Sequence, residues 1–363
     1  MDNLITIASR FTIQKKVSAI KPFGNGNVND TFLVTVDALG KEQFILQRIN
    51  TQVFRHPHLV MQNICIYTQH VSDRLQHSPL DRRWEVPQVL RTQNAQTYWS
   101  DDNGAFWRAI SYIKGSQSFD TLQDLEQAQE IGYALGVFHN LISDLPPARL
   151  ADTLQGFHIT PLYLQQYEKV RSPSISNHSS EVDYCLKFIS DRQTWAHILE
   201  TAKAQNKLPL RLMHGDPKVN NVMFDAITQK AVSIVDLDTV KPGLVHYDIG
   251  DCLRSGCNPN GEETEQWQTV HFEPDLCQAI LQGYFSVAKD FFTENDYLYL
   301  YDAIRLLAFE LGLRFFTDYL SGNVYFKVKY PEHNLIRALV QFKLTESIEF
   351  QEATLRTIIR DLQ

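Results

Sequence analysis

Hydrophobic and polar positions alternate through much of the first third of the chain, which is the pattern of half-buried β-strands. Alternation over 29–36 and 42–49, separated by Gly40 and Lys41, predicts two strands joined by a turn. Residues 57–75 instead place their apolar side chains on one helical stripe. Further strand-like stretches follow at 86–90, 96–100 and 106–113. The pattern predicts a mostly antiparallel sheet that carries one helix.

After residue 115 the spacing changes to that of helices. Apolar residues recur every three or four positions over 121–143, with Asp120 or Thr121 as the expected N-cap. A second long helix is predicted over 180–205, and helical spacing returns from 276 to 362. Short strands are expected at 210–213 and 231–235. The sequence therefore predicts an α+β chain with a small, β-rich N-terminal lobe (1–113) and a larger, mainly helical C-terminal lobe (114–363).

Composition narrows the class of protein. The 363 residues are 44% hydrophobic and 21% charged, with a net charge of -8 and no basic tract, which argues against nucleic acid as a partner. No run of 18 apolar residues and no signal peptide is found, so we expect a soluble, cytoplasmic protein without a membrane partner. The five cysteines are scattered, without metal-binding spacing, and are expected to be reduced thiols.

The polar segment 214–221 carries the strongest candidate chemistry. Its Asp216 follows a His-x pair and lies five residues before Asn221, and an apolar strand later ends at Asp236. Phosphoryl transfer needs such a set, because a carboxylate must accept the hydroxyl proton and oxygen ligands must hold Mg²⁺ on the phosphates. Asp216 is the predicted base. Asn221 and Asp236 are the predicted metal ligands, and Lys218 is placed to reach the transferring phosphate.

A glycine turn further upstream is the candidate phosphate cover. Gly24 and Gly26 lie between two predicted strands, ahead of the segment 214–221, as the glycine-rich loop of a kinase does. Paired glycines also suit a simple hairpin turn, so the motif alone leaves both interpretations open. Arg48, near the end of the second strand, is the candidate cation for the α- and β-phosphates, with a solvated strand end as the alternative.

At these residues the chain resembles the aminoglycoside phosphotransferase and choline kinase superfamily, whose members share a protein-kinase-like two-lobed fold. Within that superfamily it is most similar to the N-acetylhexosamine 1-kinase branch. The resemblance covers about 20–345. The segments that carry it are GNVNDTFLV, FILQRINTQVF, DPKVNNVMFD, VDLDTVKPGLVHYDIGDCLRSG, ELGLRFFTDYLSGNVYF and YPEHNLIRALVQF.

The resemblance implies an ATP- and Mg²⁺-dependent enzyme that phosphorylates a hydroxyl of a small-molecule acceptor. In the branch named above, this is the anomeric hydroxyl of an N-acetylhexosamine or a related sugar. Position by position, Tyr112 and Ile113 match the hinge that contacts adenine. Arg314 and Tyr325 match positions expected to contact the sugar. The resemblance also assigns the base, the metal ligands and the strand cation to the residues already named.

Two positions depart from the family pattern. Gln62 stands where a glutamate is expected to pair with the strand cation, which would leave Arg48 more loosely held. Asn27 stands where a sugar-contacting histidine is expected, so the resemblance does not fix the identity of the sugar. Asn27 is therefore kept as a candidate substrate residue.

The acceptor is predicted from charge. Between 305 and 337 the chain has five basic and three acidic residues, which fits a neutral sugar better than a cation. The alternatives are a kinase for choline, an amino alcohol or an aminoglycoside, and a weakly active nucleotide-binding module that regulates a partner. The second is suggested by Gln62. The sequence makes no prediction of the oligomeric state.

Overall fold

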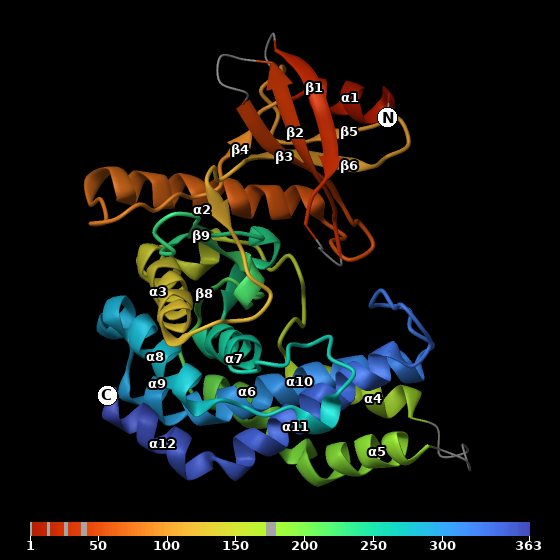
Figure 1. Ribbon diagram of the computed structural model, residues 1–363, viewed down its shortest axis with the longest axis vertical. Helices are drawn as coiled ribbons and strands as arrows, with labels where there is room; N and C mark the ends of the chain where they lie inside the picture. Colours follow the sequence, from red (N-terminus) through yellow and green to blue (C-terminus); the bar gives the residue numbers. More distant parts are fainter. Residues whose placement is uncertain (1, 13–14, 25–27, 38–41, 172–178) are drawn as a thin grey trace.

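The computed structural model describes residues 2–12, 15–24, 28–37, 42–171 and 179–363. A β-rich part lies at one end of the long axis and a larger helical part fills the other (Figure 1). The predicted turn at Gly40 and Lys41 lies outside the described residues. None of the helices described is long and apolar enough to cross a lipid bilayer.

The β-rich part is a six-stranded antiparallel sheet in the order β1-β2-β3-β6-β4, with β5 paired to β6. It carries two helices. The predicted strands at 29–36 and 42–49 and the helix at 57–75 are confirmed, whereas 86–90 and 96–100 form only two-residue strands. The elements are α1 (Asp2–Ser9), β1 (Lys16–Pro22), β2 (Asp30–Asp37), β3 (Glu42–Ile49), α2 (Pro57–His77), β4 (Val89–Leu90), β5 (Trp99–Ser100) and β6 (Phe106–Ser111).

The two faces of this sheet have different partners. Leu46 and Trp107 pack with Ile7 of α1 on the outer face. Ile49 and Phe106 instead join the core that contains the buried residues of α2. Because successive residues of a strand point to opposite faces, this assigns every residue of β3 and β6 to one face or the other. The face shared with α2 is the one turned toward the helical part (Figure 1).

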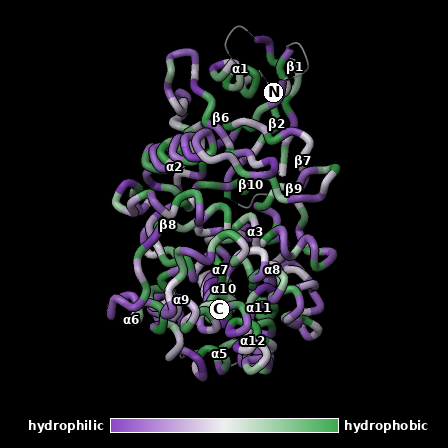
Figure 2. The backbone as a smooth tube through the Cα atoms, turned by 90° about the vertical axis from the view of Figure 1, so that its left-hand side faces the viewer, coloured by the Kyte–Doolittle hydropathy of each residue, from purple (hydrophilic) through white to green (hydrophobic). Residues whose placement is uncertain are grey.

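The helical part contains ten α-helices among the described residues, and it confirms the predicted helical character of 276–362. Hydrophobic stretches run through α10 and α11 at its centre (Figure 2), where they form a core with α5. The helices are α3 (Leu125–Leu141), α4 (Thr160–Val170), α5 (Ser180–Arg192), α6 (Ile198–Ala204), α7 (Val245–Gly256), α8 (Pro274–Ala288), α9 (Glu294–Leu298), α10 (Leu300–Leu320), α11 (His333–Phe350) and α12 (Glu352–Asp361).

Two predicted helices differ in their bounds. The helix predicted over 121–143 begins only at Leu125, because the side chain of Asp124 accepts a hydrogen bond from the backbone N–H of Gln127 and caps it there. The helix predicted over 180–205 is divided into α5 and α6 by a 3-10 turn, in which Trp195 contacts Phe309 of α10. Helix α4 was not predicted.

Short strands frame two segments between the lobes. Strand β8 (Arg211–Met213) pairs with β11 (Lys241–Gly243), and β9 (Val222–Asp225) pairs with β7 (Ser116–Gln117) and β10 (Ala231–Ile234). The catalytic loop (214–221) connects β8 to β9, and the aspartate turn (235–240) connects β10 to β11. These two antiparallel pairs therefore hold both segments that carry the predicted chemistry.

Candidate active site

Helix α7 fixes the start of the catalytic loop. The buried carboxylate of Asp248 accepts hydrogen bonds from the backbone N–H groups of His214, at 2.5 Å, and Gly215, at 2.7 Å. His139 of α3 lies 2.9 Å from the same carboxylate. Gly215 has a φ of +86°, and a Cβ there would lie 2.9 Å from Thr239. The position therefore requires glycine.

His214 ties the catalytic loop to the aspartate turn. Its Nδ1 accepts a hydrogen bond from the backbone N–H of Asp216 at 3.2 Å, so its Nε2 donates to the carbonyl of Val235 at 3.0 Å. The backbone N–H of Val235 in turn donates to the carbonyl of Asn221 at 2.8 Å. Burial lowers the pKa of His214, which keeps the imidazole neutral in this bridging role.

Asp216 has a cation and an amide beside its carboxylate. Lys218 Nζ lies 2.9 Å from Asp216 Oδ2, and Asn221 Nδ2 donates to the backbone carbonyl of Asp216 at 2.7 Å and to Oδ2 at 3.2 Å. Burial alone would raise the pKa of Asp216, but the charge and hydrogen bond of Lys218 outweigh it, so the pKa is lowered. The side chain remains 29% exposed. The geometry thus presents an ionised, accessible carboxylate.

The predicted Mg²⁺ ligands, Asn221 and Asp236, lie in the catalytic loop and the aspartate turn. The amide nitrogen of Asn221 faces Asp216, so its oxygen points the other way. Although Asp236 keeps contact with solvent, burial by the surrounding protein and the charges of Asp238 and Asp216 raise the pKa of Asp236 to about 7. This excess of negative charge fits a divalent cation. Among the described residues, no group of three or more His, Cys, Asp or Glu side chains is placed to hold a metal ion.

Arg48 does not lie where the sequence analysis placed it. Its Nε donates to Asp30 at 2.8 Å, its guanidinium lies over the ring of Trp107, and its side chain is 52% exposed on the outer face of the sheet. Gln47 instead occupies the face turned toward the aspartate turn, together with Arg108 of β6. The assignment failed because adjacent strand residues point to opposite faces, and the sequence gives no register.

The structure also corrects the expected role of Gln62 as the partner of the strand cation. Its side chain is exposed, whereas the neighbouring Asn63 is buried. Asn63 Nδ2 donates to the carbonyls of Ala151 at 2.8 Å and Val240 at 3.0 Å, and Asn63 Oδ1 accepts from the backbone N–H of Ala151 at 2.9 Å. Helix α2 is therefore fastened to the aspartate turn and the segment before α4, and the amide at position 62 has no bearing on this contact.

The glycine turn and the hinge approach one another. Phe23 packs edge-on against Tyr112 with ring centroids 5.9 Å apart, and Gly24 follows with a φ of +74°. Ile113 is buried directly after Tyr112. The structure thus brings together Gly24, Tyr112 and Ile113, three of the residues predicted to bind nucleotide. Gly26 and Asn27 lie outside the described residues.

Arg314 and Tyr325 belong to one cluster in the helical part. The guanidinium of Arg314 lies over the rings of Phe157, Tyr163 and Phe326 at 5.0–5.5 Å, and Tyr325 packs against Phe326. We call these five residues the Arg314 cluster. In the described part of the chain no carboxylate forms an ion pair with Arg314. Tyr325 is 51% exposed.

A buried ion pair connects the Arg314 cluster to the catalytic loop. His158, next to Phe157, lies 2.8 Å from Glu310 through Nδ1 and 2.8 Å from the carbonyl of Gly215 through Nε2. Glu310 lies one turn before Arg314 on α10. His158 was not predicted from the sequence, since an isolated histidine outside any motif carries no signal of its partners. From the sequence, Glu310 entered only the charge count of 305–337.

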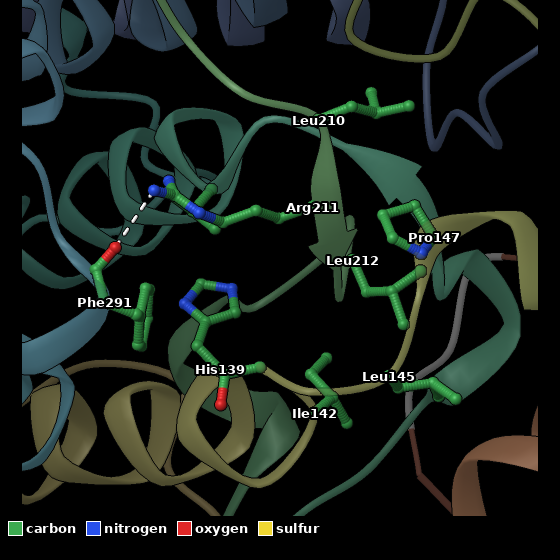
Figure 3. A pocket seen from close by; sticks show the side chains of 10 residues that line it. His139, Ile142, Leu145, Pro147, Leu210, Arg211, Leu212 and Phe291 are labelled. Atoms are coloured by element: carbon green, nitrogen blue, oxygen red, sulfur yellow. Dashed lines mark hydrogen bonds between the residues drawn. The ribbon is translucent and has the colours of Figure 1, made fainter.

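A cavity of about 110 Å³ lies beside His139, among α3, β8 and the start of α7. Arg211 and Phe291 close one side of it through a hydrogen bond from Arg211 to the carbonyl of Phe291 (Figure 3). Its lining includes none of the predicted site residues.

Comparisons with known proteins bear on the family and the fold. A profile of the phosphotransferase enzyme family (APH) matches residues 19–284. A microcompartment-associated aminopropanol kinase superposes with a TM-score of 0.60 at 15% identity, covering 98% of this chain and 99% of the other. A choline kinase from Cryptosporidium parvum Iowa II gives 0.59 at 13% identity, covering 98% of both chains. A spectinomycin phosphotransferase, solved with ADP and its antibiotic, gives 0.57 at 13% identity and the same coverage.

These likenesses confirm the predicted fold class, a β-rich lobe followed by a helical lobe in the kinase-like arrangement. The matched profile spans well over half of the chain and confirms the predicted enzyme class. The chain belongs to the APH phosphotransferase enzyme family.

Proposed function

We propose that this phosphotransferase moves the γ-phosphoryl group of ATP to a hydroxyl of a sugar, with Mg²⁺ as cofactor. The anomeric hydroxyl of an N-acetylhexosamine is the acceptor that we favour. The observation that carries the proposal is the ionised carboxylate of Asp216, 2.9 Å from Lys218 and joined to Asn221. A base, a cation and an amide oxygen then lie within one loop, as phosphoryl transfer requires.

In the proposed reaction, Asp216 orients the acceptor hydroxyl and takes up its proton as the new oxygen–phosphorus bond forms. The bond from the γ-phosphorus to the bridging oxygen breaks, and ADP leaves. Lys218 lies beside the carboxylate, where its charge can stabilise the transferring group. Mg²⁺, held by Asn221 and Asp236, would supply neutralisation of the phosphate charge.

Nucleotide binding is assigned to the interface between the lobes. Tyr112 and Ile113 are the proposed adenine contacts, and the turn that begins at Gly24 is the proposed phosphate cover. The contact between Phe23 and Tyr112 supports this, because it brings the start of the turn against the hinge. Gly26 completes the turn in sequence.

The Arg314 cluster is the proposed acceptor site. An arginine among aromatic rings suits a sugar, whose apolar face can stack while its polar groups accept hydrogen bonds. A cationic acceptor would need carboxylates, and the nearby ones are already engaged. Glu310 binds His158 and Thr160, and Asp318 accepts from the backbone N–H groups of 324–326. This favours a sugar over choline, an amino alcohol or an aminoglycoside. Asn27 remains a candidate contact from the sequence alone.

The test is ADP release, coupled to a spectrophotometric readout, over a panel of N-acetylhexosamines, plain hexoses, choline, aminopropanol and aminoglycosides. The Asp216→Asn variant serves as the control for contaminating kinases. We expect N-acetylhexosamines to give the highest kcat/KM. Faster turnover on choline or aminopropanol than on any sugar would contradict the proposed acceptor, and turnover retained in Asp216→Asn would contradict the proposed base.

A further inference from the structure

Arg108 lies between the lobes in a position that no motif predicted. It comes from β6, its side chain is only 1% exposed, and its guanidinium forms an ion pair with the buried carboxylate of Asp238 in the aspartate turn. Gln47 of β3 accepts hydrogen bonds from its Nε at 2.9 Å and its Nη2 at 2.7 Å. A buried arginine held by two partners in this way has a fixed position.

We propose that Arg108 is the positioning cation of the nucleotide site, acting through Asp238. In this role it offsets the charge of Asp238 beside the phosphates and fastens the aspartate turn to the sheet. The inference rests on the proposed function, because it assumes that ATP binds between the lobes.

The charge distribution supports an electrostatic role. Asp216, Asp236 and Asp238 place three carboxylates near the proposed triphosphate position, and the described positive groups that act on Asp236 are Lys218 and Arg108. The residue of β3 on the inner face is Gln47, which carries no charge. Without Arg108, the negative charge of Asp238 would therefore lack an ion-pair partner on the β3 and β6 strands.

The geometry supports a positioning role as well. Asp238 also accepts a hydrogen bond from Asn29 Nδ2 at 2.6 Å, and Asn29 Oδ1 accepts from the backbone N–H of Asn50 at 2.9 Å. The aspartate turn is thus bonded to the N-terminal lobe at two places. One is Arg108 of β6, and the other is Asn29, which directly precedes β2. Arg108 is the charged member of these contacts.

The experiment is a double-mutant cycle in ligand binding, measured by isothermal titration calorimetry with Mg·ATP and with adenosine. Arg108→Gln keeps a hydrogen-bonding side chain and removes the charge, so that Asp238 repels the phosphates. We expect Mg·ATP to bind roughly 10- to 100-fold more weakly and adenosine to bind within about twofold of wild type. Equal weakening of both ligands would overturn the inference, since it would show a purely structural role.

The double variant Arg108→Gln/Asp238→Asn removes both charges and leaves two amides that can bond to each other. We expect its Mg·ATP affinity to return to within about threefold of wild type. Affinity as weak as that of Arg108→Gln alone would overturn the inference, because the effect would then not pass through Asp238. The double variant also keeps the test usable if the single variant does not fold.

Arg48→Met is the matched control, since it removes the same charge from the adjacent strand but from the exposed outer face. We expect Mg·ATP affinity within about twofold of wild type, and a loss as large as that of Arg108→Gln would overturn the inference. Wild-type protein that binds no Mg·ATP would overturn the proposed function too. Wild-type binding that is unchanged in Arg108→Gln would overturn this inference alone.

Discussion

The catalytic loop and the Arg314 cluster are built in opposite ways. The backbone of the catalytic loop is held at His214 and Gly215 by two side chains. These are Asp248 of α7 and His158, which lies just before α4, and all of these contacts are buried. The Arg314 cluster consists of side chains around one guanidinium, and its Tyr325 is half exposed. A fixed backbone suits phosphoryl transfer, because the reacting atoms tolerate little displacement. In a site built from side chains, by contrast, a substitution can change which acceptor binds. We therefore expect substitutions in the catalytic loop to lower kcat, and substitutions in the Arg314 cluster to lower kcat/KM for the acceptor.

The largest expected effect is in the catalytic loop. Asp216→Asn removes the proposed base while keeping its size, so kcat should fall by roughly 10²- to 10⁴-fold. The KM for ATP should change little, because the proposed metal ligands are intact. Steady-state kinetics with the favoured sugar measures both constants. A kcat within tenfold of wild type would show that the loop is not where the proton is taken up.

Substitutions in the Arg314 cluster should instead lower kcat/KM for the acceptor and leave ATP binding almost unchanged. Arg314→Met keeps the apolar stem among the rings and removes the hydrogen-bond donors. We expect kcat/KM for the sugar to fall by roughly 10- to 100-fold, as for the loss of a charged hydrogen-bond partner. The KM for ATP should stay within about twofold. Equal changes in both KM values would remove the distinction between the two regions.

Asp248 tests whether the catalytic loop depends on its support from α7. Asp248→Asn replaces a carboxylate that accepts two backbone N–H groups by an amide with one acceptor oxygen. We expect the free energy of unfolding to fall by about 1–3 kcal/mol, with a lower kcat at unchanged acceptor KM. Chemical denaturation and kinetics measure the two effects. Wild-type stability in this variant would show that the loop holds its shape without α7.

His158 gives the smallest effect and the clearest dependence on pH. Burial alone would lower the pKa of His158, but Glu310 outweighs it and raises that pKa above 6.5. The stabilisation that the pair of His158 and Glu310 gives the folded protein is therefore complete below about pH 6.5. It is lost as the pH rises through the raised pKa of His158. Thermal melts of wild type and His158→Gln should differ most near pH 6, by on the order of 1 kcal/mol, and should converge at higher pH. A difference that grows with pH would contradict the assignment.

The sequence predicted those features that a local pattern encodes. The spacing of Asp216 and Asn221 gave the catalytic loop, and the alternation over 42–49 gave β3. It could not tell that Gln47 rather than Arg48 faces the helical part, because a shift of one residue exchanges the faces of a strand. On helix α2, adjacent side chains also point in different directions, and the sequence did not show that Asn63, rather than Gln62, is the buried one. Contacts between distant segments, such as Arg108 with Asp238, depend on tertiary packing and leave no local pattern.

The most direct test of the proposed reaction is ³¹P NMR of wild-type protein with Mg·ATP and an N-acetylhexosamine. We predict that the ATP signals decline as those of ADP and a sugar 1-phosphate appear together, and that the Asp216→Asn protein forms both products at least roughly 100-fold more slowly. ADP that appears with inorganic phosphate alone, or a phosphate ester only when choline or aminopropanol replaces the sugar, would contradict the account.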